Sequence, residues 1–131
     1  MTEDEVRATM LMVIQNAGQG YSGIRLETLE RYRDILNLGL IPFAPKEGSV
    51  GYLSPEAHIA MAVMGEGKMM VDGKEVPALD LLRENNLDKY DLAYKEGLIL
   101  VSGTTGVTGR AALALHDIIK SVKSADVIGA M

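Results

Sequence analysis

The sequence contains no cysteine and no tryptophan among its 131 residues, and it has a single phenylalanine. The absence of cysteine excludes disulfides, thiolate catalysis and cysteine-based metal sites. The only histidines are His58 and His116, and neither has a carboxylate or a second histidine at ligand spacing on the same helical face. We therefore interpret both histidines as structural residues and predict no metal site.

Positive charge is also scarce, because 13 lysines and arginines stand against 18 acidic residues and leave a formal net charge of −5. An acidic surface repels phosphate backbones, so nucleic acid is not an expected partner. The first residues lack the basic and apolar regions of a signal peptide, and no uninterrupted apolar run approaches the length of a membrane span. These features predict a soluble, cytoplasmic protein of one domain's length, with no membrane association.

Hydrophobic periodicity predicts a mainly α-helical fold. Thr2 and Glu5 form a capping-box pattern ahead of a helix that reaches Gly18. A second helix is expected over residues 26–38, with Gly39 positioned to end it. Prolines and glycines in residues 41–51 indicate an ordered loop.

The second half of the sequence predicts one small β-hairpin between helices. Ser54-Pro55-Glu56 indicates a helix start with the Ser54 hydroxyl as its cap, and the helix that follows, as far as Met64, is apolar on nearly every side. Asp72-Gly73 predicts the turn of a hairpin over residues 69–76, followed by a short helix within residues 77–87. A long helix closes the chain, and its predicted buried side consists of Val107, Ala111, Ala114, Leu115, Ile118, Ile119 and Val122.

A glycine-spaced segment, residues 102–109, follows the apolar run at residues 95–101. A strand that runs into such a turn and then a helix is typical of dinucleotide-binding folds, which also need a second parallel strand carrying an acid. Asp126 has nearly the right spacing but falls within the predicted helix, so no nucleotide site is predicted. The serines have no base placed for a nucleophilic triad. We interpret the tyrosines as packing residues: Tyr21, Tyr32, Tyr52, Tyr90 and Tyr94.

Several motifs, in order, resemble those of the histidine and aromatic amino acid ammonia-lyases. Residues 20–25 are similar to the family's Gly-x-Ser-Gly-Val/Ile-Arg segment, and residues 39–51 are similar to the loop that approaches its active site. Residues 52–58 align with the family's Asp-Leu-Ala-Pro-Leu-Ala-His. The later matches are Gly65-Glu66-Gly67, Asp72-Gly73-Lys74, Pro77-Ala78, Lys95-Glu96-Gly97-Leu98 and residues 111–117, and the likeness continues to Asp126.

The resemblance implies a helical fragment of the ammonia-lyase fold, in the fumarase/aspartase-like superfamily. It also implies three parts: residues 1–51 lead to the catalytic turn, residues 52–87 hold the apolar helix and hairpin, and residues 88–131 hold a glycine loop and long helix. In that family an Ala-Ser-Gly tripeptide forms the electrophilic cofactor methylidene-imidazolone, or MIO. Here Gly51 is followed directly by Tyr52, which leaves a gap of three residues where the tripeptide belongs.

The resemblance also implies the residues of a site. Those expected to contact substrate or electrophile are Ser102, Gly103, Thr104, Thr105, Tyr52 and Leu53, and those expected to support them are Ser22, Gly23, Arg25, Gly48, Ser49 and Gly51. Three of these positions depart from the family pattern: Ser102 stands for asparagine, Thr105 for glutamine and Tyr52 for aspartate. A serine hydroxyl is shorter than an amide and lacks its paired donor and acceptor.

The activity implied is non-oxidative elimination of ammonia from a small L-amino acid, with histidine favoured over phenylalanine and tyrosine; aminomutases use the same electrophile. Three interpretations stay open. The chain is a fragment without MIO and without turnover, or the tripeptide exists as one modified residue that the one-letter sequence omits. In the third, the chain is a subunit or binding module that self-associates or completes a longer lyase-like chain. Because the family's upstream catalytic tyrosine and C-terminal half are missing, we expect this chain alone to be inactive.

Overall fold

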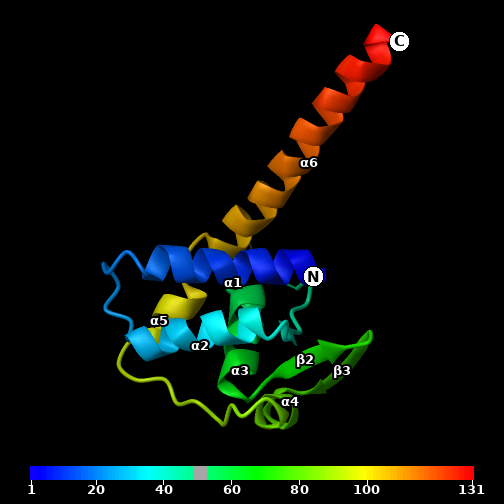
Figure 1. The fold of residues 1–131 in the computed structure, drawn as a ribbon. Coiled ribbons are helices and arrows are strands. Elements are labelled where there is room, and N and C mark those ends of the chain that lie inside the picture. Colours follow the sequence, from blue (N-terminus) through cyan, green and yellow to red (C-terminus); the bar gives the residue numbers. More distant parts are fainter. Residues whose placement is uncertain (49–52) are drawn as a thin grey trace.

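The computed structural model describes residues 1–48 and 53–131, which form helices around a small sheet (Figure 1). Both the predicted mainly helical fold and the predicted hairpin are confirmed. The elements in chain order are α1 (Glu3–Ala17), α2 (Leu26–Asn37), β1 (Ile41–Pro42), α3 (Ser54–Met64), β2 (Lys68–Val71), β3 (Lys74–Pro77), α4 (Ala78–Glu84), α5 (Glu96–Val101) and α6 (Thr105–Ala130).

The capping box at the start of α1 is present as predicted. The Glu5 amide donates to the Thr2 hydroxyl at 3.3 Å, and the Thr2 amide donates back to the Glu5 carboxylate at 2.8 Å. Helix α2 also has the predicted limits, and Gly39 follows it with a φ of 70°, a left-handed conformation that favours glycine.

The sheet has the order β1-β2-β3, and both pairs are antiparallel. The turn between β2 and β3 is formed by Asp72 and Gly73, with φ values of 49° and 76°, as a tight hairpin turn requires. Strand β1 corrects the prediction of a loop over residues 41–51, because Ile41 and Pro42 pair with Met70 and Met69. Two residues are too few to show an alternating pattern, so this pairing was not legible in the sequence.

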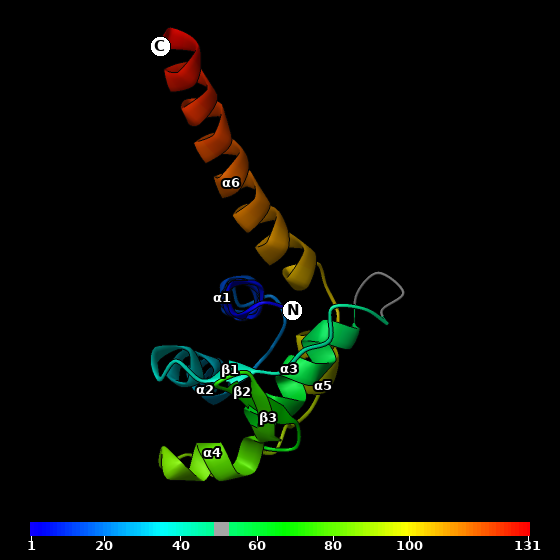
Figure 2. The same ribbon diagram turned by 90° about the vertical axis from the view of Figure 1, so that its right-hand side faces the viewer.

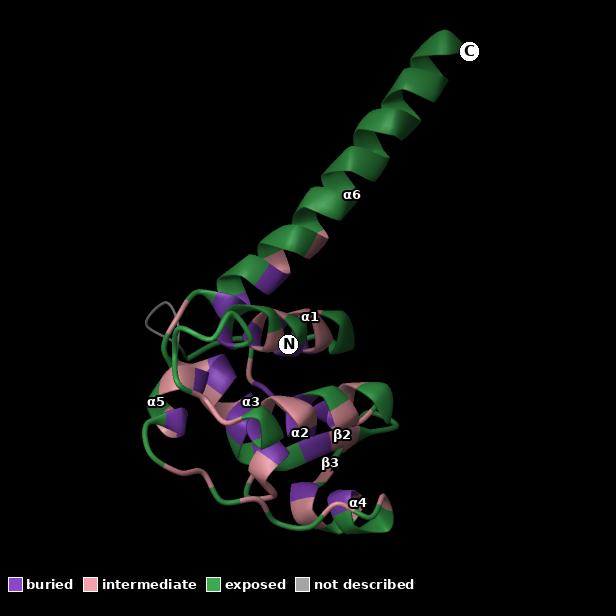
Figure 3. Cartoon of the chain, turned by 60° about the vertical axis from the view of Figure 1, so that its left-hand side comes forward, coloured by how far each residue is buried: buried purple, intermediate pink, exposed green. Residues whose placement is uncertain are grey.

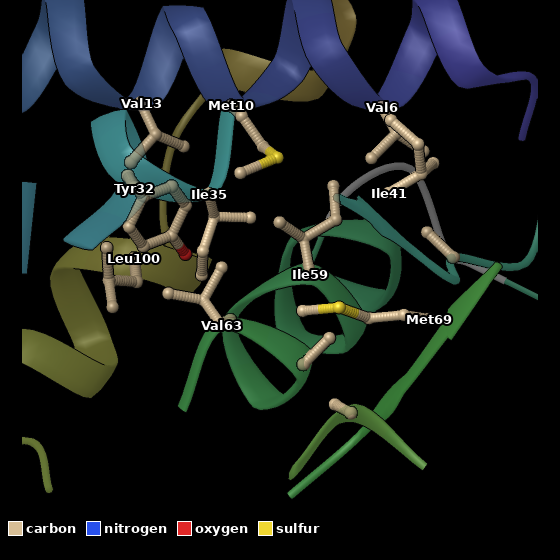
Figure 4. Close-up of a cluster of buried hydrophobic side chains, with 14 of the residues drawn as sticks. Val6, Met10, Val13, Tyr32, Ile35, Ile41, Ile59, Val63, Met69 and Leu100 are labelled. Carbon is tan, nitrogen blue, oxygen red and sulfur yellow. The ribbon is translucent and has the colours of Figure 1, made fainter. Parts of the chain in front are cut away.

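The core lies where α1, α2, α3 and the start of the sheet converge (Figure 4). Helix α3, predicted to need protein on every side, is largely buried, and of its large apolar side chains Met61 is exposed. Tyr32 is part of this core, at 1% exposed, and its hydroxyl has no partner among the described residues. Burial raises the pKa of Tyr32, so the phenol stays protonated and serves packing.

Helix α6 corrects the prediction of a buried apolar side. The helix crosses α1 at its first turns and then extends away from the body of the protein (Figures 1 and 2). Its buried residues are Thr105, Gly106 and Gly109. All seven residues predicted to be buried are exposed instead, for example Leu115 at 57% and Ile118 at 58% (Figure 3). The periodicity correctly locates an apolar stripe, but a period does not tell whether the covering surface belongs to the same chain.

By length and composition, Glu96–Ala130 meets the criterion for a helix that could cross a membrane. The segment, which includes both α5 and α6, is apolar on average, although charged residues such as Arg110 interrupt it. The core helices of soluble proteins meet the same criterion, so the observation is weak evidence for a membrane location.

Candidate active site

Arg25, at the end of the Gly20–Arg25 motif, is held by Glu96 at the start of α5. The Arg25 guanidinium donates to the Glu96 carboxylate at 2.7 Å, and the Arg25 amide donates to it at 3.0 Å. Glu96 is 0% exposed and also accepts from the Thr28 hydroxyl at 2.6 Å and the Ala93 amide at 2.8 Å. Burial alone would raise the pKa of Glu96, but these donors, with Arg25 the strongest, outweigh it and hold the pKa at about 2. Two motifs 71 residues apart therefore form one ionic contact.

The start of α3 differs in detail from the sequence prediction. Ser54 was expected to cap the helix, but it is the first helical residue, and Leu53 occupies the cap position without a side-chain cap. Leu53 has a φ of 86°, a conformation that is unfavourable for a residue with a Cβ. The Leu53 carbonyl accepts the Ala57 amide at 2.8 Å and closes the first turn. The strained residue is thus also the first described residue after the position where the tripeptide was expected.

Glu56, in the first turn of α3, connects this helix to the first turn of α6. It is 3% exposed, and its Oε1 accepts the Gly106 amide at 3.0 Å. A Cβ atom at position 106 would overlap the same carboxylate oxygen, so any larger residue there would have to displace the Glu56 side chain. The sequence interpretation missed this role for Glu56. The available signal was its departure from the leucine of the family's Pro-Leu-Ala-His pattern.

The Ser102–Thr105 segment lies between α5 and α6. Because α5 is a helix and not a strand, this segment lacks the strand–turn–helix geometry of a dinucleotide-binding loop. Gly103 has a φ of 143°, and Ser102 and Thr104 are exposed. Thr104 and Thr105 line a cavity of about 240 Å³ against one end of α1; its other lining residues are Met12, Gln15, Asn16, Gln19 and Thr108.

The structure brings only part of the expected site together. The Glu56–Gly106 bond links the segment that follows Leu53 to the segment from Ser102 to Thr105. Ser22, Gly23 and Gly48 are exposed loop residues, and Arg25 bonds to Glu96 and to the Asp91 carbonyl, which lie outside the Ser102–Thr105 segment. The remaining predicted site positions lie outside the described residues: Ser49, Gly51, Tyr52 and the point between Gly51 and Tyr52.

The two histidines have different environments. His58 packs edge-on against the ring of Phe43, with 6.4 Å between ring centroids, which agrees with a structural role. His116 is exposed on α6, so the prediction of a structural role was wrong for this residue. Within residues 1–48 and 53–131, no group of three or more potential ligands is placed to hold a metal ion.

The arrangement of helices around a small antiparallel sheet is shared with solved structures of an aminomutase and an ammonia-lyase. The family model described as aromatic amino acid lyase matches residues 1–131, and the chain belongs to this family.

Three relatives show the breadth of the likeness. The chain is similar to histidine ammonia-lyase of Streptococcus sanguinis strain SK36, at 42% identity over 134 residues, covering 100% of the chain and 26% of the relative. It is similar in structure to tyrosine aminomutase from Streptomyces globisporus, with a TM-score of 0.80 and 38% identity over 83% of this chain and 21% of that one. It is also similar in structure to Ergothionase, an ergothioneine degrading enzyme from Treponema denticola, with a TM-score of 0.82 and 31% identity; the match covers 90% of this chain and 24% of that one.

Two facts about these matches bear on the site. The chain spans about a quarter of the length of the curated relatives that it matches. The alignment with the streptococcal enzyme has 134 positions and includes the whole 131-residue chain, so at least three positions of that enzyme have no counterpart here. This minimum of three is the length of the tripeptide that the sequence lacks between Gly51 and Tyr52.

Proposed function

We propose that the chain forms part of the substrate site of a carbon–nitrogen lyase of the ammonia-lyase class, which acts on a small L-amino acid, with histidine favoured. One observation carries the proposal: the buried Glu56–Gly106 bond joins the start of α3 to the Ser102–Thr105 segment. In the lyases that this chain resembles, those two segments adjoin the electrophile and the substrate. The division into residues 1–51, 52–87 and 88–131, and a cytoplasmic location, are part of the same proposal.

The residues present do not fit the MIO cofactor. No Ala-Ser-Gly tripeptide lies between Gly48 and Leu53, and the alignment with the streptococcal relative leaves at least three of its positions unmatched. A ring formed from three consecutive residues cannot form without them, so we assign no step to MIO. What the described residues supply is a pair of helix N-termini, whose positive ends favour negative charge that develops on a substrate.

The test of this proposal combines turnover with intact mass. The full-length protein is incubated with L-histidine, L-tyrosine and L-phenylalanine, and the unsaturated acid product is followed by its ultraviolet absorbance. We expect no release of ammonia from the chain alone, release from one of these substrates when a longer lyase-like chain is added, and a mass equal to that of the printed residues. A mass above that of the printed residues, together with inactivation by borohydride, would instead show that the tripeptide is present in its modified form. No turnover on any substrate, with or without the longer chain, would support the inactive-subunit interpretation.

A second candidate follows from the missing tripeptide. An electrophile can capture a substrate's amine only if the nitrogen has a lone pair, and the nitrogen of a quaternary ammonium group has none. Such a group leaves as a neutral tertiary amine without capture, so its elimination needs only removal of a proton from the neighbouring carbon. Ergothioneine carries its nitrogen as a trimethylammonium group, and a structural relative of this chain is an ergothioneine degrading enzyme. Release of trimethylamine from ergothioneine, with no ammonia from histidine, would favour this candidate.

We also propose that the apolar side of α6 binds a second copy of the chain or a longer lyase-like chain. Leu115, Ile118 and Val122 lie on one side of the helix and are each more than half exposed, at 57%, 58% and 56%. Apolar stripes of this length in soluble proteins mark interfaces. The chain spans about a quarter of its curated relatives, so a complementary surface belongs either to another copy or to the remaining three quarters of such a protein.

Light scattering of the purified chain tests this interface. We expect a mass above that of the monomer, and we expect Ile118→Glu to reduce it to the monomer because a buried unpaired carboxylate is costly. Ser124→Glu is the matched control, since its spacing at 3.6 residues per turn places it on the other side of α6. A monomeric wild-type chain that also fails to bind a longer family member would contradict the proposal.

A further inference from the structure

We propose that Glu56 is a positioning residue, which fixes the Ser102–Thr105 segment against the start of α3, and that residue 106 is glycine in order to admit its carboxylate. This inference rests on the proposed function in one respect, which is that the Ser102–Thr105 segment lies beside the substrate. The pairing of Glu56 with Gly106 stands on geometry alone.

The contact is buried and specific. Glu56 Oε1 accepts the Gly106 amide at 3.0 Å, and Glu56 is 3% exposed. The Gly106 amide belongs to the first turn of α6, where backbone N–H groups have no partner within their own helix. The carboxylate therefore does for α6 what a capping side chain normally does, but from a different helix. The segment just before it, from Ser102 to Thr105, is thereby tied to α3 by a hydrogen bond and not by packing alone.

The contact depends on the residue at each of its two positions. In the family pattern that residues 52–58 resemble, leucine stands at position 56, and leucine accepts no hydrogen bond. With glutamate there, any side chain at position 106 would overlap the carboxylate oxygen. A glutamate at position 56 thus explains a glycine at a helix position where glycine is otherwise unfavourable.

The electrostatic setting stabilises a charge at this place. Glu56 lies in the first turn of α3 and faces the first turn of α6, so the positive ends of two helices approach one carboxylate. Its second oxygen, Oε2, is buried and has no partner among the described residues. The Glu56–Gly106 hydrogen bond is buried, so its removal is expected to loosen the Ser102–Thr105 segment locally.

Amide hydrogen exchange at Gly106, measured in the full chain, tests the pairing. Glu56→Leu is expected to speed exchange about 10- to 100-fold, because the buried Gly106 amide loses its acceptor. Glu56→Gln keeps an oxygen in place and is expected to stay within about threefold of wild type. Glu75→Gln removes an exposed carboxylate, paired with Lys68 at 2.7 Å on the hairpin, and is expected to leave Gly106 unchanged.

A double-mutant cycle tests the requirement for glycine. Gly106→Ala is expected to lower the midpoint of urea unfolding in the wild type and to lower it less when combined with Glu56→Ala, because no carboxylate then has to be displaced. Equal effects in the two backgrounds, or unchanged Gly106 exchange in Glu56→Leu, would overturn the proposal. If Glu56→Leu does not fold, Glu56→Asp provides the exchange measurement, since its shorter side chain withdraws from Gly106.

These measurements need no turnover, so they are independent of the proposed activity. Where turnover is detected, Glu56→Leu is expected to lower kcat more than it raises KM, with recovery in Glu56→Gln. A coupled pair in a protein without lyase activity would refute the proposed function and retain the pairing. If the protein is a lyase and Glu56→Leu changes neither its kcat nor the exchange of the Gly106 amide, the proposed function is retained and the pairing is refuted.

Discussion

Glu96→Gln is expected to lower the free energy of unfolding by about 3 kcal/mol at neutral pH, the lower end of the range for breaking a buried ion pair. The carboxylate is 0% exposed and accepts hydrogen bonds from Arg25, Thr28 and Ala93. Glutamine fills the same space but removes the charge and converts one acceptor into a donor that faces other donors. The cost stays at the lower end because the Arg25 side chain is 34% exposed and water solvates its charge after the substitution.

The pH dependence of this effect has a definite sign. The pKa of Glu96 is lowered from 4.5 to about 2 in the folded protein, so the folded state binds the proton less readily than the unfolded state. Its contribution to stability, about 3 kcal/mol, is complete above pH 4.5 and is lost as the pH falls from 4.5 toward 2. Urea unfolding of wild type and Glu96→Gln should therefore differ most at pH 7 and converge below pH 3.

Glu75→Gln is the matched control, since the Glu75–Lys68 pair has the same 2.7 Å separation but is exposed. Exposed pairs contribute about 0–1 kcal/mol, so this substitution should change stability little at any pH. If Glu75→Gln and Glu96→Gln had equal effects, the Arg25–Glu96 contact would not be the anchor between the Gly20–Arg25 motif and α5.

Gly109→Val is expected to destabilise the protein by about 3 kcal/mol, the upper end of the usual range for overpacking. Gly109 is where α6 crosses α1, and a Cβ there would lie 2.9 Å from the backbone carbon of Ala8 and the backbone nitrogen of Thr9. Backbone atoms inside a helix cannot rotate away as a side chain can, so the two helices must separate. Thermal unfolding and the near-ultraviolet dichroism of the core would report this.

Gly129→Val, in the same helix, is the control for helix propensity. A Cβ at position 129 meets nothing within 4 Å. The same substitution there should change stability by no more than about 0.5 kcal/mol. Similar losses at both positions would mean that backbone preference, and not the α1–α6 crossing, determines the cost at Gly109.

Local chemistry made much of the fold predictable from the sequence. The Thr2–Glu5 capping box and the Asp72-Gly73 turn are decided within a few residues, and both are present where they were expected. The motifs around Gly20–Arg25 and residues 95–98 indicated the family, which the matching family model confirms. The apolar character of α3 also predicted its burial correctly, because a helix without a polar face is stable only when protein covers it on every side.

What the sequence did not reveal depends on contacts between distant segments. Strand β1 exists only because Ile41 and Pro42 meet β2, and Glu56 matters only because the start of α6 reaches it. The burial of the α6 stripe was predicted wrongly for the same reason: periodicity describes one helix, whereas burial depends on its neighbours. For the candidate site, family resemblance predicted the segments, and this remains a prediction; the residue that joins two of them, Glu56, departs from the family pattern.

The long extension of α6 has a thermodynamic consequence for assembly. Beyond Gly109 its residues are exposed, or partly buried in the case of Arg110 and Leu113, so little tertiary packing supports the helix there. Most of the stability of helices in proteins comes from tertiary packing, because helix formation begins from an unfavourable nucleus. The distal half of α6 should therefore fray and reform in the free chain. The helix would become fully ordered only when a partner binds its apolar side. Part of the binding free energy would then offset the entropy that the chain loses, which lowers the affinity and favours a reversible interface.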